Sequence, residues 1–332
     1  MEKLLPEISS HYNQQVLSAW CRHGWNDLEG MLMLPAIKKD YYGVDSEEIS
    51  SPFLHVEYLT GAGPRIVGLY RSGVEKNYLA ETPSIHWETP NGTYYLRGGH
   101  RLWYAPEQFP LSSLPDNQPV TVEQIDHGIR LSQTPEKLTG IQKSIEFLLD
   151  DNRPTIQVIH TLTNWGAAPQ KIAPWGITLL PSGGVAILPQ HTRTLDEDGL
   201  LPNRNLVLWP YTQITDPRLG LGEDYWTVRA DSNPRPCKIG YLNLSGWVAY
   251  QFQGLIFCKW FSVDHTLPLA DMGVNIEVYA NQHALELETL GQLALLAPGE
   301  SVVQTEHWGC FESIDDPFLD DYVRRVIKHH PG

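Results

Sequence analysis

Two short stretches of this 332-residue sequence carry charged side chains where a strand-rich chain usually has apolar ones. The first, Leu96 to Glu107, places Arg97, His100 and Arg101 around a pair of glycines and a pair of aromatic residues. The second, residues 285–289, alternates leucine with glutamate. Side chains alternate between the two faces of a strand, so the two glutamates would share one face and the two leucines the other.

The paired glutamates, Glu286 and Glu288, are the clearest candidates for chemistry. Two carboxylates side by side on a pleated surface repel each other unless a cation or a ligand lies between them. Such a face is therefore either a solvated strand edge or a site.

The arginines and the tryptophan of the first stretch suit ligand binding. Arg97 and Arg101 could hold sugar hydroxyls, a carboxylate or a phosphate through two parallel hydrogen bonds. The alternative is a structural ion pair with Glu107 or Glu88. Trp103 offers an apolar face on which a sugar ring can lie, together with an N–H donor. Most of the 11 tryptophans are expected to fill the core instead.

The composition limits the classes of partner. Acidic residues outnumber basic residues by 39 to 24, which gives a formal net charge of −15. Nucleic acids and anionic membranes bind basic surfaces, so we expect neither as a partner. The expected ligand is a neutral or polar small molecule, although a local basic pocket would still accept an anion.

No motif indicates a cofactor, a metal or a targeting segment. The four cysteines are widely separated and form no CxxC pair, so neither a disulfide framework nor a zinc site is indicated. No nucleophile elbow, P-loop or dinucleotide fingerprint occurs. The start lacks the pattern of a secretory signal, and no apolar run approaches the roughly 18 residues of a membrane span. We expect a soluble cytoplasmic protein without a metal or cofactor.

Short extended segments separated by glycine and proline predict an all-β fold. From Phe53 onward such runs recur at short intervals, and none has the pattern of a crossover helix. We expect a single antiparallel β-sandwich domain over residues 51–332, with residues 1–50 as an N-terminal extension packed on it. A short C-terminal helix is expected after Asp315. The irregular stretch from Pro189 to Asp224 is expected to form a lid or binding wall.

Three segments, in this order, resemble the galactose mutarotase-like superfamily, which contains the aldose 1-epimerases and the hexose-6-phosphate mutarotases. Arg97–Gly99 resembles the Arg-Gly-Gly segment of the hexose-6-phosphate mutarotases. Gln157–Asn164, together with Pro169, is similar to the strand, turn and strand that precede the family's second catalytic position. Leu287–Thr289, followed by Leu296–Glu300, resembles the strand that carries the family's glutamate base and the turn after it. The resemblance implies an antiparallel β-supersandwich.

The resemblance also implies interconversion of sugar anomers. In the family, a glutamate takes the proton of the C1 hydroxyl, a histidine protonates the ring oxygen, and reclosure inverts C1. Glu288 matches the position of the base. The family's histidine would fall near Trp175, where this sequence has none. His100 is the favoured substitute, and His160 and His191 are alternatives. On its apolar strand, His160 is more typical of a core histidine.

The remaining candidates are expected to line the same concave face and bind substrate: Arg97, Arg101, Trp103, Glu107, Trp175, Lys259, Glu277 and Glu286. We expect Arg97, His100, Arg101 and Glu288 to converge on one pocket for a sugar or sugar derivative. Three hypotheses remain open. The chain is a sugar mutarotase or epimerase, a non-catalytic sugar-binding protein on the same scaffold, or a polysaccharide lyase or hydrolase that uses Tyr104 beside Arg101. The sequence assigns no oligomeric state.

Overall fold

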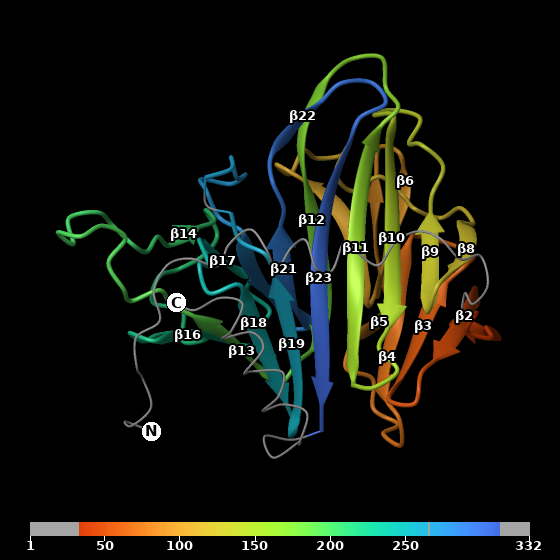
Figure 1. The fold of residues 1–332 in the computed structure, drawn as a ribbon, viewed down its shortest axis with the longest axis horizontal. Helices are drawn as coiled ribbons and strands as arrows, with labels where there is room; N and C mark the ends of the chain where they lie inside the picture. The colour runs from red at the N-terminus through yellow and green to blue at the C-terminus, as the bar shows by residue number, and fades with distance from the viewer. Residues whose placement is uncertain (1–32, 265, 313–332) are drawn as a thin grey trace. The chain divides into compact units, whose positions relative to one another are not determined.

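The computed structural model describes residues 33–264 and 266–312, and this part of the chain consists of antiparallel strands joined by turns and loops (Figure 1). No helix occurs in it, which confirms the all-β class expected from the sequence. The expected C-terminal helix after Asp315 lies outside the described residues. None of the described segments is a helix long and apolar enough to cross a membrane.

The first sheet contains eleven of the described strands, in the order β1-β2-β3-β4-β7-β12-β21-β20-β17-β14, with β22 paired to β12. Their bounds are β1 Ile37–Tyr41, β2 Val44–Ser50, β3 Leu54–Leu59, β4 Arg65–Arg71, β7 His100–Ala105, β12 Gln170–Pro181, β14 Val207–Leu208, β17 Cys237–Tyr241, β20 Ile276–Ala280, β21 Ala284–Leu290 and β22 Ala294–Leu296.

The second sheet contains ten of the described strands, in the order β15-β16-β13-β18-β19-β23-β11-β10-β9-β8. Their bounds are β8 Thr121–Ile125, β9 Gly128–Ser132, β10 Ile141–Leu149, β11 Thr155–Asn164, β13 Val185–Pro189, β15 Leu219–Leu221, β16 Tyr225–Arg229, β18 Trp247–Phe252, β19 Leu255–Phe261 and β23 Ser301–Phe311. The remaining two strands, β5 (Glu81–Thr89) and β6 (Gly92–Gly98), form a separate hairpin.

The core lies between the two large sheets, which stack face to face (Figure 1). Val56, Leu102 and Leu287 from the first sheet join one buried cluster with Phe147 and Val158 from the second. Burial alternates residue by residue along β10 and β11, because one face of each strand meets the core and the other does not. Each fully buried side chain of this size contributes about 1.5–3 kcal/mol of transfer free energy.

The segment before residue 51 contributes strands to the first sheet. Within the predicted extension 1–50, the structure describes residues 33–50, and β1 and β2 occupy most of them. Residues Ser46–Ser50 of β2 pair with β3, and β1 pairs with β2. The stretch from Pro189 to Asp224 is mostly irregular, as expected, and contains only the short strands β14 and β15.

Two adjacent glycines allow the chain to pass from the hairpin into β7. Gly98 and Gly99 have φ angles of 90° and 69°, in the left-handed region that favours glycine. A Cβ at Gly99 would collide with the carbonyl oxygen of Ile66 on β4. The Gly-Gly pair in the first charged stretch therefore serves a close backbone approach, and it sets where β7 begins.

Candidate functional site

Strand β21 directs Glu286 and Glu288 to the outer face of the first sheet, the face turned away from the second sheet. Leu285 and Leu287 are fully buried in the core between the sheets. Because side chains alternate along a strand, the glutamates between and beyond them project to the opposite face. This is the alternation that the sequence predicts.

Strand register then places charged residues of separate strands in two rows across the outer face. One row contains, in order from β7 to β20, Arg101, Ile177, Glu288 and Glu277. The adjacent row contains, from β12 to β17, Leu179, Glu286, Tyr279 and Lys238. Directly paired residues on neighbouring strands have Cβ atoms about 5 Å apart, so the side chains in these rows can reach one another.

Lys238 holds two buried carboxylates together. Its Nζ lies 2.6 Å from Glu277 Oε2 and 3.0 Å from Glu288 Oε2, between the rings of Trp175 and Trp209 at 4.5 and 4.6 Å. Burial alone would lower the pKa of Lys238, but the two carboxylates raise it above its usual value. Burial also raises the pKa of Glu277 well above its usual value, although Lys238 opposes this. One cation thus serves two carboxylates.

Glu286 is the member of the glutamate pair that solvent reaches. Its side chain is 15% exposed, and its Oε1 lies 3.1 Å from Arg101 Nη2. The guanidinium carbon of Arg101 lies 4.7 Å from the ring centroid of Trp103. Burial raises the pKa of Glu286; Arg101 opposes this effect and Glu288 adds to it. The outcome is a partly exposed carboxylate with an increased affinity for protons.

An open cavity of about 390 Å³ lies against these rows. Its aromatic lining consists of Trp87, Trp103, Trp175, Tyr211 and Tyr279. Its polar lining consists of Arg101, Glu107, Lys238, Asn281, His283 and Glu286. The apolar side chains Ile85, Leu96 and Ile177 complete it. We call this hollow the aromatic cavity; strands of the first sheet, the β5–β6 hairpin and the loops carrying Glu107 and Tyr211 all contribute to it.

Glu288 lies next to the aromatic cavity and does not line it. Its side chain is 0% exposed, and its Oε2 accepts hydrogen bonds from Trp175 Nε1 at 2.6 Å and Lys238 Nζ at 3.0 Å. Its Oε1 has no hydrogen-bond partner among the described residues. Trp175 and Lys238 both line the cavity, so Glu288 positions two cavity-lining side chains through its hydrogen bonds without lining the cavity itself.

His100 does not face the aromatic cavity, contrary to the expectation that it donates a proton there. It is fully buried, with Nδ1 2.8 Å from Thr178 Oγ1 and Nε2 2.7 Å from His160 Nε2. His100 and Arg101 are consecutive in β7, so only one of them can project toward the outer face. Burial, reinforced by His160, lowers the pKa of His100 well below its usual value. The hydrogen-bonded histidines His100 and His160 therefore belong to the interior of the sandwich.

Lys259 also lies inside the sandwich, where the sequence placed it on the concave face. It is part of β19 in the second sheet and is 0% exposed. Its Nζ lies 3.2 Å from Glu306 Oε2 and 3.1 Å from the carbonyl oxygen of Leu287. Burial lowers the pKa of Lys259, and Glu306 opposes this. Lys259 therefore neutralises a buried carboxylate in the core.

Two further candidates from the sequence lie away from the aromatic cavity. Tyr104, proposed as a lyase base beside Arg101, is 3% exposed and belongs to the buried core cluster of the sandwich. His191, an alternative proton donor, lies at the start of the irregular stretch from Pro189 to Asp224, here called the long loop. It is not among the cavity-lining residues. Neither placement supports a role in the cavity.

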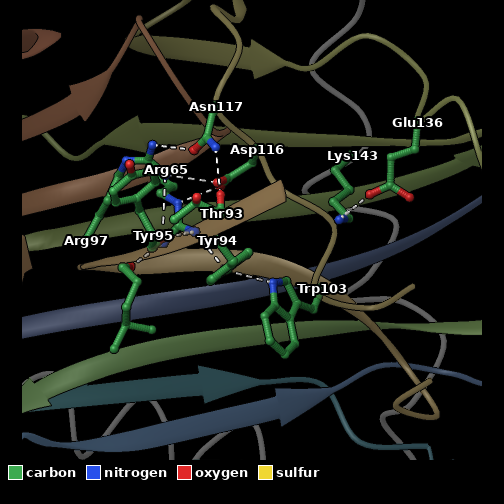
Figure 2. A network of polar contacts seen from close by, with 11 residues as sticks. Arg65, Thr93, Tyr94, Tyr95, Arg97, Trp103, Asp116, Asn117, Glu136 and Lys143 are labelled. Carbon is green, nitrogen blue, oxygen red and sulfur yellow. Dashed lines mark hydrogen bonds and ion pairs between the residues drawn. The ribbon is translucent and has the colours of Figure 1, made fainter. Parts of the chain in front are cut away.

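Arg97, on the hairpin strand β6, belongs to a network of polar contacts (Figure 2). It is not among the residues that line the aromatic cavity. Its Nη1 lies 3.0 Å from Asp116 Oδ1, and its Nη2 donates to Asn117 Oδ1 at 2.6 Å. The fully buried Arg65 binds the same aspartate at 2.7 Å. The expected convergence is therefore divided: Arg101 and the glutamate pair meet on one face, whereas His100 and Arg97 are used elsewhere. The interpretation of Arg97 as a structural ion pair fits, with Asp116 as the partner.

Tyr94 connects this network with Trp103 (Figure 2), and Trp103 lines the aromatic cavity. Its hydroxyl accepts hydrogen bonds from Arg65 Nη2 at 2.7 Å and from Trp103 Nε1 at 3.1 Å. The Tyr94 ring also packs on Trp87, with 4.6 Å between the ring centroids. Two tryptophans of the cavity are thus positioned by one buried tyrosine.

Replacing Tyr94 by phenylalanine should lower the free energy of unfolding by about 1–3 kcal/mol. The substitution leaves two buried donors, on Arg65 and Trp103, without their shared acceptor. Urea unfolding followed by circular dichroism measures the change. Tyr95→Phe is the matched control, because Tyr95 is the adjacent residue and its side chain is exposed. Equal stabilities of the two variants would contradict the role given to the Tyr94 hydroxyl.

The sequence analysis missed several residues of the site, including Lys238, Tyr279, Tyr211, Trp87 and His283. For Lys238 the sequence does carry a signal. It is the single charged residue of the five-residue strand β17, where it stands between Cys237 and Ile239. The loop residue Tyr211 and the hairpin residue Trp87 carry no such signal. No group of three or more His, Cys, Asp or Glu side chains suited to a metal ion is found within residues 33–264 and 266–312.

Comparisons with known proteins place the fold. No family model matches the sequence, and no curated protein matches it. Among solved structures, a candidate aldose 1-epimerase from Klebsiella pneumoniae subsp. pneumoniae is 12% identical, with 89% of this chain and 85% of that chain covered and a TM-score of 0.60. A galactose mutarotase-like protein from Lactobacillus casei is 9% identical, with 80% and 99% covered and a TM-score of 0.54.

A TPR-domain containing protein from Parabacteroides distasonis is also similar, at 14% identity and a TM-score of 0.56. The match covers 83% of this chain and 48% of that one, so this chain spans about half the length of that relative. These likenesses confirm the galactose mutarotase-like fold that the sequence motifs implied. At such low identity they speak for the fold alone.

Proposed function

We propose that this protein binds a carbohydrate in the aromatic cavity. The observation that carries the proposal is the lining: five aromatic side chains line the same cavity as the ion pair of Glu286 and Arg101. Aromatic faces suit the apolar C–H faces of a sugar ring, and the ion pair offers both donors and acceptors to hydroxyl groups. A volume of about 390 Å³ lies within the range of small-molecule pockets. The fold shared with a galactose mutarotase-like protein and with a candidate aldose 1-epimerase supports the same ligand class.

The aromatic contribution can be tested on Tyr211, whose side chain lines the cavity from the long loop. Tyr211→Ala should weaken binding of a monosaccharide about threefold to tenfold, because one sugar-facing ring is removed. Isothermal titration calorimetry measures the affinity. Tyr225→Ala is the matched control: Tyr225 is 50% exposed, Tyr211 is 40% exposed, and Tyr225 does not line the cavity. Equal affinities of the two variants would contradict the assigned pocket.

A second candidate function, interconversion of anomers, is favoured by the partly exposed carboxylate of Glu286. A general base must approach the proton that it takes to hydrogen-bond distance. Glu286 lines the cavity, whereas Glu288 is 0% exposed behind Trp175 and Lys238. The increased proton affinity of Glu286 also suits a base. We therefore assign the base to Glu286 and a supporting role to Glu288, although the family resemblance points to Glu288.

The proton donor for this reaction would be His283, the one histidine that lines the cavity within the described part of the chain. Glu286 takes the proton of the C1 hydroxyl while the bond between C1 and the ring oxygen breaks. His283 in its charged form gives its proton to the ring oxygen, so the sugar opens to its aldehyde form. Rotation about the C1–C2 bond and the reverse proton transfers then close the ring with C1 inverted.

Exchange spectroscopy by NMR tests the catalytic hypothesis. Saturating the anomeric proton of one anomer should reduce the signal of the other much faster in the presence of the protein than in buffer. A protein that binds the sugar while exchange stays at the buffer rate would exclude catalysis and leave the binding function in place.

A further inference from the structure

The charges around the aromatic cavity are unbalanced toward negative. The cations are Arg101 and Lys238, and each already has carboxylate partners. Arg101 binds Glu286, while Lys238 binds the buried Glu277 and Glu288. Arg101 Nε and Nη1 have no hydrogen-bond partner among the described residues, but both atoms are buried. Both cations of the lining therefore already share their charge with carboxylates, and His283 is the remaining basic side chain there.

Two carboxylates in the lining still have capacity for a positive charge. Glu286 uses Oε1 for Arg101, and no hydrogen bond to its Oε2 occurs among the described residues. Glu107 lines the cavity from the loop after β7, is exposed, and has no ion pair within residues 33–264 and 266–312. A phosphate or carboxylate on the ligand would face these two groups and be repelled, whereas a cation would be attracted.

The rings of the cavity suit the same sign of charge. Aromatic faces attract cations through the negative face of the ring, and cages of such rings recognise ammonium groups. The structure already uses this chemistry internally: Arg101 lies over Trp103 at 4.7 Å, and Lys238 lies over Trp175 at 4.5 Å. Tyr211 and Tyr279 also line the cavity, and no cation is found over either ring in the described chain.

From these observations we infer that the natural ligand is an amino sugar, a monosaccharide unit whose protonated amino group lies between Glu286 and Glu107. The inference rests on the proposed carbohydrate-binding function and narrows its substrate class. It also makes an anionic sugar, such as a sugar phosphate or uronate, a poor ligand, because Arg101 and Lys238 already share their charges with carboxylates. Neutral sugars fit the rings and can donate hydroxyl hydrogen bonds to the carboxylates, but they bring no positive charge to them.

Isothermal titration calorimetry with four probes tests the inference: glucosamine, N-acetylglucosamine, glucose and glucose 6-phosphate. These share one ring and differ in the charge that they carry. Glucosamine should bind about tenfold more tightly than glucose and N-acetylglucosamine, from an ion pair and cation–π contacts. Glucose 6-phosphate should bind more weakly than glucose. Equal or tighter binding of N-acetylglucosamine or glucose 6-phosphate than of glucosamine would overturn the inference while keeping the proposed function. No binding by any probe would overturn both.

Variants of Glu286 and Glu107 test whether these two carboxylates cause the expected preference for glucosamine over glucose. Glu286→Gln keeps the shape of the side chain, and it should bring the affinity ratio of glucosamine to glucose close to one. Glu107→Gln replaces an exposed residue without an ion pair, so it should fold normally and reduce the ratio as well. Glu123→Gln, on the edge strand β8 of the second sheet, is the matched control and should leave the ratio unchanged. A ratio unaffected in both cavity variants would contradict the assignment.

Discussion

Replacing Lys238 by methionine should lower the free energy of unfolding at neutral pH by about 3–5 kcal/mol. Methionine fills much of the same space, so the principal loss is the charge. Without Lys238, the buried carboxylates of Glu277 and Glu288 face each other on paired strands with no cation between them. Removing one partner of a buried ion pair costs far more than an exposed pair is worth. Chemical unfolding followed by circular dichroism measures the change.

Two controls separate this charge effect from a packing effect. Lys171→Met changes an exposed lysine on β12 and should alter stability by no more than about 0.5 kcal/mol. Glu277→Gln leaves one lysine with one carboxylate and should cost at most about 1 kcal/mol. If Lys238→Met cost no more than Lys171→Met, the lysine would not be the charge that stabilises this face.

The Glu277 control also has a predicted dependence on pH. The pKa of Glu277 is raised in the folded protein, so the folded state binds this proton more tightly than the unfolded state. The stabilisation from this group is present below its ordinary pKa of 4.5 and is lost as the pH rises through the folded value. Relative to wild type, Glu277→Gln should therefore be more stable at about pH 7 than at about pH 4.

Glu286→Gln should slow the exchange of sugar anomers about a hundredfold, if the protein catalyses it. The amide keeps the size of the side chain and can still hydrogen-bond to Arg101, but it cannot take a proton from the C1 hydroxyl. A neutral sugar such as glucose should bind with nearly unchanged affinity. NMR exchange rates and calorimetry on the same samples separate the two effects.

Glu288→Gln is the informative comparison for this prediction. Glu288 is enclosed behind Trp175 and Lys238, so its replacement should change stability more than it changes the exchange rate. A hundredfold loss of rate in Glu288→Gln, with Glu286→Gln near wild type, would reverse the assignment. The base would then stand at the position that the family resemblance indicates.

Much of the fold could be predicted from the sequence because strand periodicity is a local property. The alternation of leucine and glutamate in β21 correctly separates the core face from the outer face. The same rule, applied to β7, separates His100 from Arg101, and it could have removed His100 from the list of cavity residues. The choice of His100 as proton donor rested on its charged neighbours instead.

The composition of the site depends on register, which the sequence does not reveal. Lys238 and Glu288 are separated by 50 positions, and they meet because β20 lies between β17 and β21 in the first sheet. Lys259 also lies among apolar residues, on β19, but β19 belongs to the second sheet. Its ammonium group is therefore buried in the core between the sheets. Which sheet a strand joins is set by long-range pairing, and no local pattern distinguishes these two lysines.

The most direct test of the proposed binding function is saturation-transfer difference NMR on a panel of monosaccharides that includes glucosamine and glucose. Selective irradiation of the protein's aromatic protons should transfer saturation to the ring protons of a bound sugar, because five aromatic side chains line the cavity. We expect a clear transfer to at least one sugar with wild-type protein, and a weaker one with Tyr211→Ala. The absence of transfer to every sugar in the panel, or undiminished transfer in Tyr211→Ala, would contradict carbohydrate binding in the aromatic cavity.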